Sequence, residues 1–142
     1  MRRLPILFAF LVLTPVALAA CGGDKKEAAT EGARVTCRAD AFKGDVGLPP
    51  KFPMPAEFVV TGSTQEGPTR VIVGYWESGL DEAHNEWRDR VKEAGFVVTF
   101  DELEDHDSEV AYKGSGRTGI IQLRDRCTED EVTYVRITSR PE

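Results

Sequence analysis

Hydrophobic positions near the middle of the chain recur with the period of an amphipathic helix. From Ser78 to Gly95, apolar residues three or four positions apart fall on one stripe of a helical wheel: Leu80, Ala83, Trp87, Val91 and Ala94. Ser78 is suited to cap the start, and Gly95 followed by Phe96 is typical of a left-handed C-cap. The pattern predicts one helix with one buried face.

Short runs of β-branched and aromatic residues, separated by turn residues, flank this helix on both sides. Two runs precede it and four follow: 57–62, 69–76, 96–100, 109–113, 117–124 and 132–139. The order ββαββββ predicts an α+β fold, a two-layer sandwich with the helix on one antiparallel sheet. Residues 34–37 suit a short edge strand. The proline-rich stretch 40–55 predicts an extended loop that plugs one edge of the core with Leu48, Phe52 and Met54.

The first residues have the pattern of a secretory signal. Arg2 and Arg3 are followed by an apolar run over 4–16, which is shorter than the roughly 20 residues of a membrane span. Small residues then lead to a cysteine.

The sequence Leu18-Ala19-Ala20-Cys21 resembles the lipobox of bacterial lipoproteins. The resemblance implies that residues 1–20 are cleaved, that Cys21 carries a diacylglyceryl group, and that the chain is anchored in the cell membrane or outer membrane, facing away from the cytoplasm. Residues 21–33, small and charged, predict a flexible tether. Residues 34–142 then form a single extracytoplasmic domain.

Charge narrows the range of partners. Without Arg2 and Arg3 the chain keeps sixteen basic and twenty-four acidic residues, a net charge of −8. Nucleic acid and anionic lipid are unfavourable partners for such a domain, so the lipid anchor, not electrostatics, is expected to hold it at the membrane. No cofactor motif is present, and we expect no cofactor.

The number of cysteines is consistent with a domain outside the cytoplasm. With Cys21 assigned to lipid, Cys37 and Cys127 remain in an oxidising compartment, and we expect a disulfide between them. The alternative is a reactive or metal-binding thiol pair, but the sequence has no Cys-x-x-Cys and no histidine close to either residue.

The stretch 101–109 gathers six carboxylates around His106 between two strands. Such oxygen ligands suit a weak Ca²⁺ site, with Asp105, Asp107 and Glu109 as candidate ligands. The competing interpretation is a solvated loop, because the glycine and final glutamate of an EF-hand loop are missing.

His84 lies at the margin of the helix stripe and is expected to be a half-buried structural residue. A histidine-based hydrolase would need His84 or His106 to meet a serine and a carboxylate in space. No nucleophile motif is present, so we expect no enzyme.

Strand alternation predicts one sheet face that the helix leaves open. If Val71, Val73 and Ile137 point to the helix, the opposite face carries basic and aromatic candidates for ligand binding: Arg70, Trp76, Arg124, Tyr134 and Arg136. The alternative is an ordinary solvated face. We therefore expect a lipid-anchored, non-enzymatic module that binds an envelope protein or polymer through this face, with calcium or ligand sensing by the stretch 101–109 as the second hypothesis.

Overall fold

The structure is a computed structural model that describes residues 33–142 except Pro50. The described residues belong to one compact unit. The signal peptide, the lipidation of Cys21 and all but the last residue of the tether lie outside the described residues and stay predictions. Within the described part of the chain, no helix is long and apolar enough to cross a membrane.

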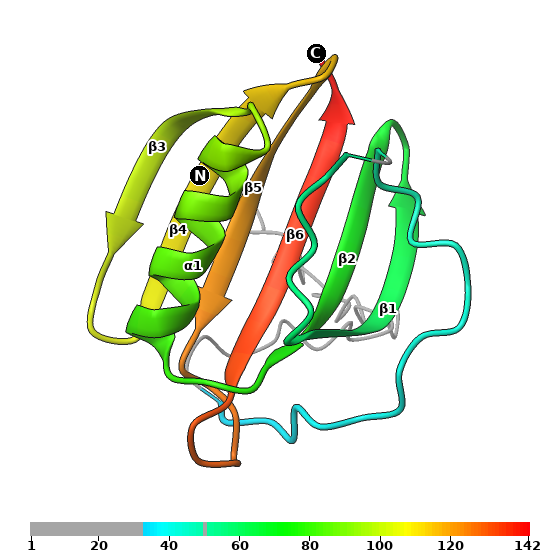
Figure 1. Ribbon diagram of the computed structural model, residues 1–142. Helices are drawn as coiled ribbons and strands as arrows, with labels where there is room; N and C mark the ends of the chain where they lie inside the picture. Colours follow the sequence, from blue (N-terminus) through cyan, green and yellow to red (C-terminus); the bar gives the residue numbers. More distant parts are fainter. Residues whose placement is uncertain (1–32, 50) are drawn as a thin grey trace, which may run out of the picture. The chain divides into compact units, whose positions relative to one another are not determined.

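One helix and six strands make up the described part of the chain (Figure 1). In chain order these are β1 (Phe58–Glu66), β2 (Thr69–Trp76), α1 (Leu80–Glu93), β3 (Val97–Leu103), β4 (Asp107–Gly114), β5 (Arg117–Arg124) and β6 (Thr133–Pro141). All strand pairs are antiparallel, in the spatial order β1-β2-β6-β5-β4-β3. The prediction of an α+β fold with one helix packed on one antiparallel sheet is confirmed.

The connection through α1 explains why spatial order and chain order differ. After β2 the chain crosses over the sheet in the helix and continues at the far edge with β3, and the meander β3–β6 then returns to pair β6 with β2. The last strand therefore lies beside the first hairpin, in the middle of the sheet.

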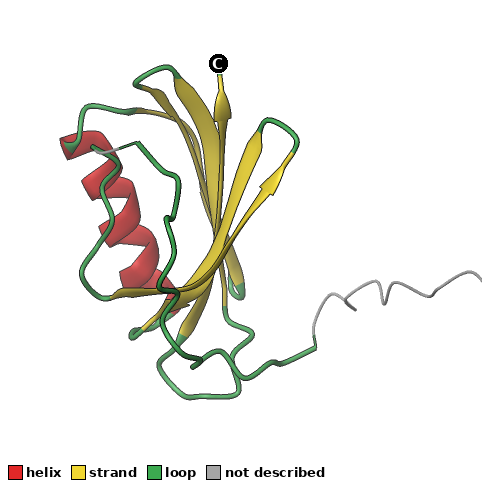
Figure 2. Cartoon of the chain, turned by 90° about the vertical axis from the view of Figure 1, so that its right-hand side faces the viewer, coloured by secondary structure: helices red, strands yellow, loops and turns green. Residues whose placement is uncertain are grey.

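The core lies between α1 and one face of the sheet (Figure 2). Trp87 of the helix is fully buried among aromatic rings, at centroid distances of 5.5 Å from Phe58 and 6.0 Å from Trp76. The helix covers β3, β4 and β5. Phe52, from the proline-rich loop, packs against Trp87 and Tyr112 beside the helix. The loop thus belongs to the core, with Leu48 and Met54 partly buried against it.

The two ends of the helix differ from one another in how well the sequence predicted them. Gly95 has a φ of +85°, and the Phe96 N–H donates to the Val91 carbonyl, as expected for a left-handed C-cap. The prediction of Ser78 as N-cap is wrong. Gly79 occupies that position without a side-chain cap, and the Ser78 carbonyl instead accepts a bond from the Thr133 hydroxyl.

The expected loop over 101–109 is also mostly strand. Asp101 pairs with Val110 and Leu103 with Ser108, so only residues 104–106 turn the chain. Cross-strand pairing and the contact of Asp101 with the helix outweigh the low strand propensity of these acidic residues.

Candidate binding face and acidic hairpin

The face of the sheet opposite α1 carries three of the five predicted ligand-binding residues. Arg124, Tyr134 and Arg136 lie here, because their neighbours Leu123, Val135 and Ile137 point into the main core. We call this surface the open face; of the described elements, α1 and the proline-rich loop lie on the other side of the sheet.

The prediction that Arg70 and Trp76 share this face is wrong. Ile72 pairs with Ile137 in the main core, so the alternation turns Trp76 toward the helix, where it is 4% exposed. Arg70 lies on the same side, close to the backbone of Gly47. Val71 and Val73 accordingly lie on the open face.

The reason for the error is that β2 is apolar on both sides. Tyr75 joins a second buried cluster with Val132, Cys37 and Cys127, next to Val59 and Tyr134. This cluster lies where residues 34–37 cross one end of the open face. Because both faces of β2 are covered at this end, a period of two in its sequence does not show which face the helix covers.

Polar side chains form a hydrogen-bonded row across three strands of the open face. Arg136 Nη1 donates to Gln122 Oε1 at 3.0 Å, and Gln122 Nε2 donates to Glu109 Oε1 at 2.7 Å. Arg124 stands opposite Asp107 in the β4–β5 ladder. The amide of Gln122 thus holds a cation and a carboxylate in fixed positions. Gln122 shares this face with Arg124, two positions along β5, but the sequence carries no signal for its partners.

A hollow of about 430 Å³ lies farther along the same face, toward the β4–β5 turn. Its lining is mainly small, apolar or hydroxyl-bearing: Thr69, Ala111, Thr118, Gly119, Ile120, Thr138 and Arg140. Side chains from four strands build it, so only the sheet order reveals it. The open face therefore combines a polar row with a weakly apolar hollow.

The ring of Tyr134 is less available for ligand binding than the sequence analysis predicts. The Arg126 guanidinium carbon lies 5.2 Å from the centre of its ring, a cation–π contact, and Tyr134 also packs against the second cluster. Its aromatic face is therefore engaged within the protein.

The candidate calcium ligands stand along the acidic hairpin formed by β3, residues 104–106 and β4. Within the described residues, Asp105, Asp107 and Glu109 do not form a group in which the ligand atoms of three side chains all lie within 4.8 Å of one another. Glu109 already binds Gln122. A shallow hollow of about 440 Å³ is lined by residues 104–107. The calcium hypothesis stays a prediction, and the change of melting temperature with millimolar Ca²⁺ tests it.

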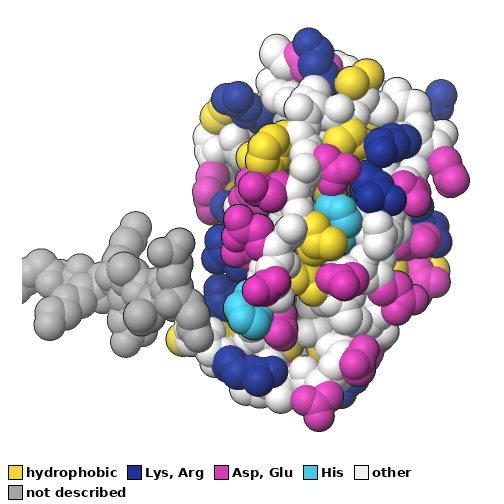
Figure 3. All heavy atoms as spheres, turned by 90° about the vertical axis from the view of Figure 1, so that its left-hand side faces the viewer, with side chains coloured by type: hydrophobic (Ala, Val, Ile, Leu, Met, Phe, Trp, Pro, Cys, Tyr) yellow, Lys and Arg dark blue, Asp and Glu magenta, His cyan; other side chains and the backbone are white. Residues whose placement is uncertain are grey.

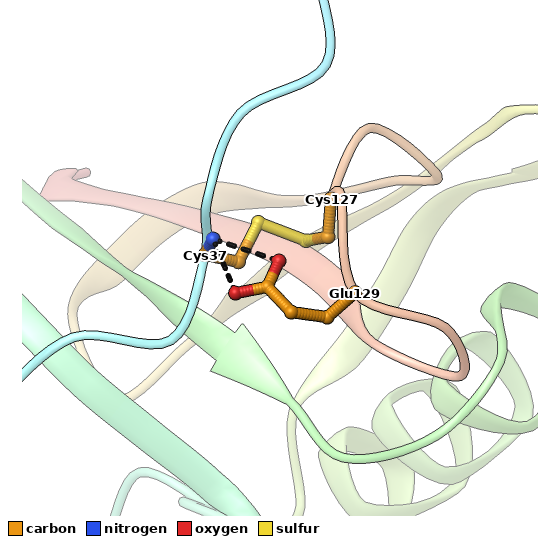
Figure 4. A group of neighbouring side chains, drawn as sticks. All are labelled: Cys37, Cys127 and Glu129. Atoms are coloured by element: carbon orange, nitrogen blue, oxygen red, sulfur yellow. Dashed lines mark hydrogen bonds between the residues drawn. A yellow bond between two sulfur atoms is a disulfide. The ribbon is translucent and has the colours of Figure 1, made fainter.

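In the described residues, one group of three potential metal ligands does have its ligand atoms within 4.8 Å of one another: Cys37, Cys127 and Glu129. Its sulfur atoms form a disulfide, which confirms the predicted pairing, and the Glu129 carboxylate accepts the Cys37 N–H at 3.1 Å (Figure 4). The same carboxylate also accepts the Arg38 N–H at 3.0 Å. These backbone bonds, that of Arg38 first, lower the pKa of Glu129 to about 2. The arrangement fastens residues 35–38 to the loop after β5, and we read it as structural.

His84 is more buried than expected, 3% exposed, and it meets both a serine and a carboxylate. Its Nε2 lies 3.1 Å from Asp101 Oδ1, and its Nδ1 lies 2.6 Å from Ser108 Oγ. Asp101 can only accept when ionised, so Nε2 carries the proton and the Ser108 hydroxyl donates to Nδ1. Burial lowers the pKa of His84, although Asp101 acts in the opposite direction.

This trio has the residue types of a hydrolase, but its setting suits a structural role. Ser108 is 1% exposed beneath α1, where a substrate carbonyl cannot approach its hydroxyl without displacing the helix. Two of the three residues belong to adjacent strands, and His84 comes from the helix. The trio therefore ties α1 to the β3–β4 hairpin.

Comparisons with models of known protein families, with curated proteins and with solved structures found no match for this chain.

Proposed function

We propose that this chain is a lipid-anchored domain of the cell envelope that binds a protein or an envelope polymer through the open face of its sheet. The observation that carries the proposal is the polar row from Glu109 through Gln122 to Arg136, which lies beside the hollow around Ile120. Such a surface offers fixed hydrogen-bonding groups next to apolar area, the usual composition of a binding site.

The arginine side chains of the open face favour an acidic or polyhydroxylated partner. Arg124, Arg136 and Arg140 lie here beside the carboxylates Glu102, Asp107 and Glu109. Lys113, on the same face, is already paired with Glu142 at 3.1 Å. Arginine presents several donors in a plane and pairs with carboxylates, phosphates and sugar hydroxyls. The location follows from the lipobox resemblance, which would keep the domain within a short tether of the membrane.

Site-specific photo-crosslinking in cells tests the proposal. A photoreactive residue at Ile120 is expected to give a discrete adduct, whereas the same residue at Asn85, exposed on the helix, gives none. Arg124→Glu with Arg136→Glu should abolish the adduct, and the charge-matched Lys43→Glu with Lys92→Glu should preserve it. The proposal fails if Ile120 and Asn85 give the same products, or if both charge reversals act alike.

A further inference from the structure

The outer edge of β3 is the most exposed strand edge in the described part of the chain. No described segment pairs with its outer side, and six of its seven residues are exposed. Three of the four exposed large hydrophobic residues lie on this one strand: Val97 at 64%, Phe100 at 47% and Leu103 at 42%. An unpaired strand edge with apolar side chains is a template for another strand.

The opposite edge of the sheet is protected. The Phe42 N–H donates to the Val60 carbonyl of β1, and the Ser63 hydroxyl donates to the Val46 carbonyl. The loop over 42–46 thus covers part of the outer side of β1. The same fold therefore covers one edge and leaves the other open.

The edge of β3 is also held in place from within. Asp101 accepts from the buried His84, and β3 pairs with β4 along six residue pairs. A partner segment would meet an ordered strand, so only the partner would lose conformational freedom on binding.

Acidic side chains lie among the apolar ones on this edge. Asp101 and Glu102 belong to β3, and Glu104 and Asp105 continue beyond its end. Figure 3, which views the molecule from this side, shows hydrophobic and acidic groups intermingled. This charge selects a basic partner. A second copy of the chain would instead bring two acidic hairpins together, and like charges across strands are destabilising.

We propose that the outer edge of β3 binds an extended segment of a partner protein in which Lys or Arg alternates with Val, Leu or Phe, adding it to the sheet as a further strand. Main-chain hydrogen bonds supply affinity, and the apolar and acidic side chains of β3 select the sequence. This binding site is distinct from the open face, because it is a strand edge and its partner is basic, whereas the open face favours an acidic or polyhydroxylated partner.

The test uses the full chain in detergent micelles and two synthetic decapeptides, one alternating Lys with Val and one alternating Glu with Val. The Lys–Val peptide is expected to bind, measured by fluorescence anisotropy, and to slow amide hydrogen exchange in residues 97–103. The pair Glu102→Lys and Glu104→Lys should weaken binding about tenfold, since two favourable cross-strand charge pairs become repulsive. The matched pair Glu66→Lys and Glu93→Lys should leave it unchanged.

Phe100→Ser, at an exposed position that the core does not need, should also weaken binding and provides a second test if the charge variant does not fold. The proposal is overturned if the peptide leaves exchange in β3 unchanged, if both charge pairs weaken binding equally, or if the Glu–Val peptide binds as well. It is also overturned if β3 becomes protected with rising protein concentration alone, which would mean that a second copy occupies the edge. Because the readout is β3 and not Ile120, failure here is distinct from failure of the open-face proposal.

Discussion

The hydroxyl of Ser108 donates to Nδ1 of His84 at 2.6 Å, and both side chains are buried. The bond joins β4 to α1 at a place where water cannot replace either partner. It therefore makes the junction of helix and sheet sensitive to the loss of one oxygen atom.

Ser108→Ala is expected to lower the free energy of unfolding by about 1–3 kcal/mol, the cost of a buried acceptor left without its donor. Urea unfolding measures this. In a His84→Phe background the same change should cost much less, because the acceptor is already gone. Equal costs in the two backgrounds would contradict the bond.

Stability should depend on pH through His84. Its pKa in the folded protein is lowered from the ordinary 6.5, mainly by burial. Below pH 6.5 the unfolded chain takes up a proton that the folded protein resists, so stability is full above 6.5 and falls as the pH drops toward the lowered pKa. Urea midpoints between pH 8 and 5.5 should show this decline.

Two variants separate His84 from other titrating groups. His84→Gln should flatten the pH dependence in that window. His106→Gln should not, because the His106 side chain is 81% exposed. A slope unchanged in His84→Gln would rule out His84 as its source.

Removing the disulfide should be the most costly change at the N-terminal end of the domain. Cys37 and Cys127 are 90 positions apart in the sequence. In the chain-entropy model, closing a loop of that length contributes about 4–5 kcal/mol. The double variant Cys37→Ser and Cys127→Ser should lose stability of this order in urea, and a loss below about 1 kcal/mol would mean that the bridge constrains the unfolded chain little.

Glu129 should contribute to stability only while it is ionised. Its pKa is lowered from 4.5 to about 2 by the backbone N–H groups of Arg38 and Cys37. Its contribution is therefore present above pH 4.5 and is lost as the pH falls toward 2. Acid unfolding followed by circular dichroism should begin at higher pH in Glu129→Gln than in the control Asp130→Asn; coincident transitions would refute the contribution.

Gly119 is required by the path of the Tyr112 side chain, whose hydroxyl crosses β5 to donate to the Thr138 carbonyl at 3.0 Å. A Cβ at position 119 would lie 2.7 Å from that hydroxyl and 1.9 Å from that carbonyl. Gly119→Ala should cost about 1–3 kcal/mol in thermal or urea unfolding. Gly62→Ala, where the nearest side-chain atom is 3.2 Å away, should cost less.

The number, type and order of the elements could be predicted from the sequence, because each follows mainly from local chemistry, whereas the helix N-cap and the extent of strand over 101–109 could not. The 3.6-residue period from Leu80 to Val91 and the glycine at 95 predicted the helix, and the apolar runs between turns predicted the strands. The cysteine count, once Cys21 was assigned to lipid, predicted the bridge between Cys37 and Cys127. That pairing followed from the count of cysteines and from the oxidising compartment that the lipobox resemblance implies.

The faces that those elements present could not be predicted, because they depend on how the whole sheet is assembled. The face of Trp76 depends on the register of β2 against β6 and on the N-terminal segment that buries Tyr75, neither of which leaves a periodic signal. The meeting of His84, Asp101 and Ser108 and the open edge of β3 depend on the crossover that carries the chain from β2 to the far side of the sheet. Pairing of distant segments is set by the packing of the whole core, and the residues that meet there need share no local pattern.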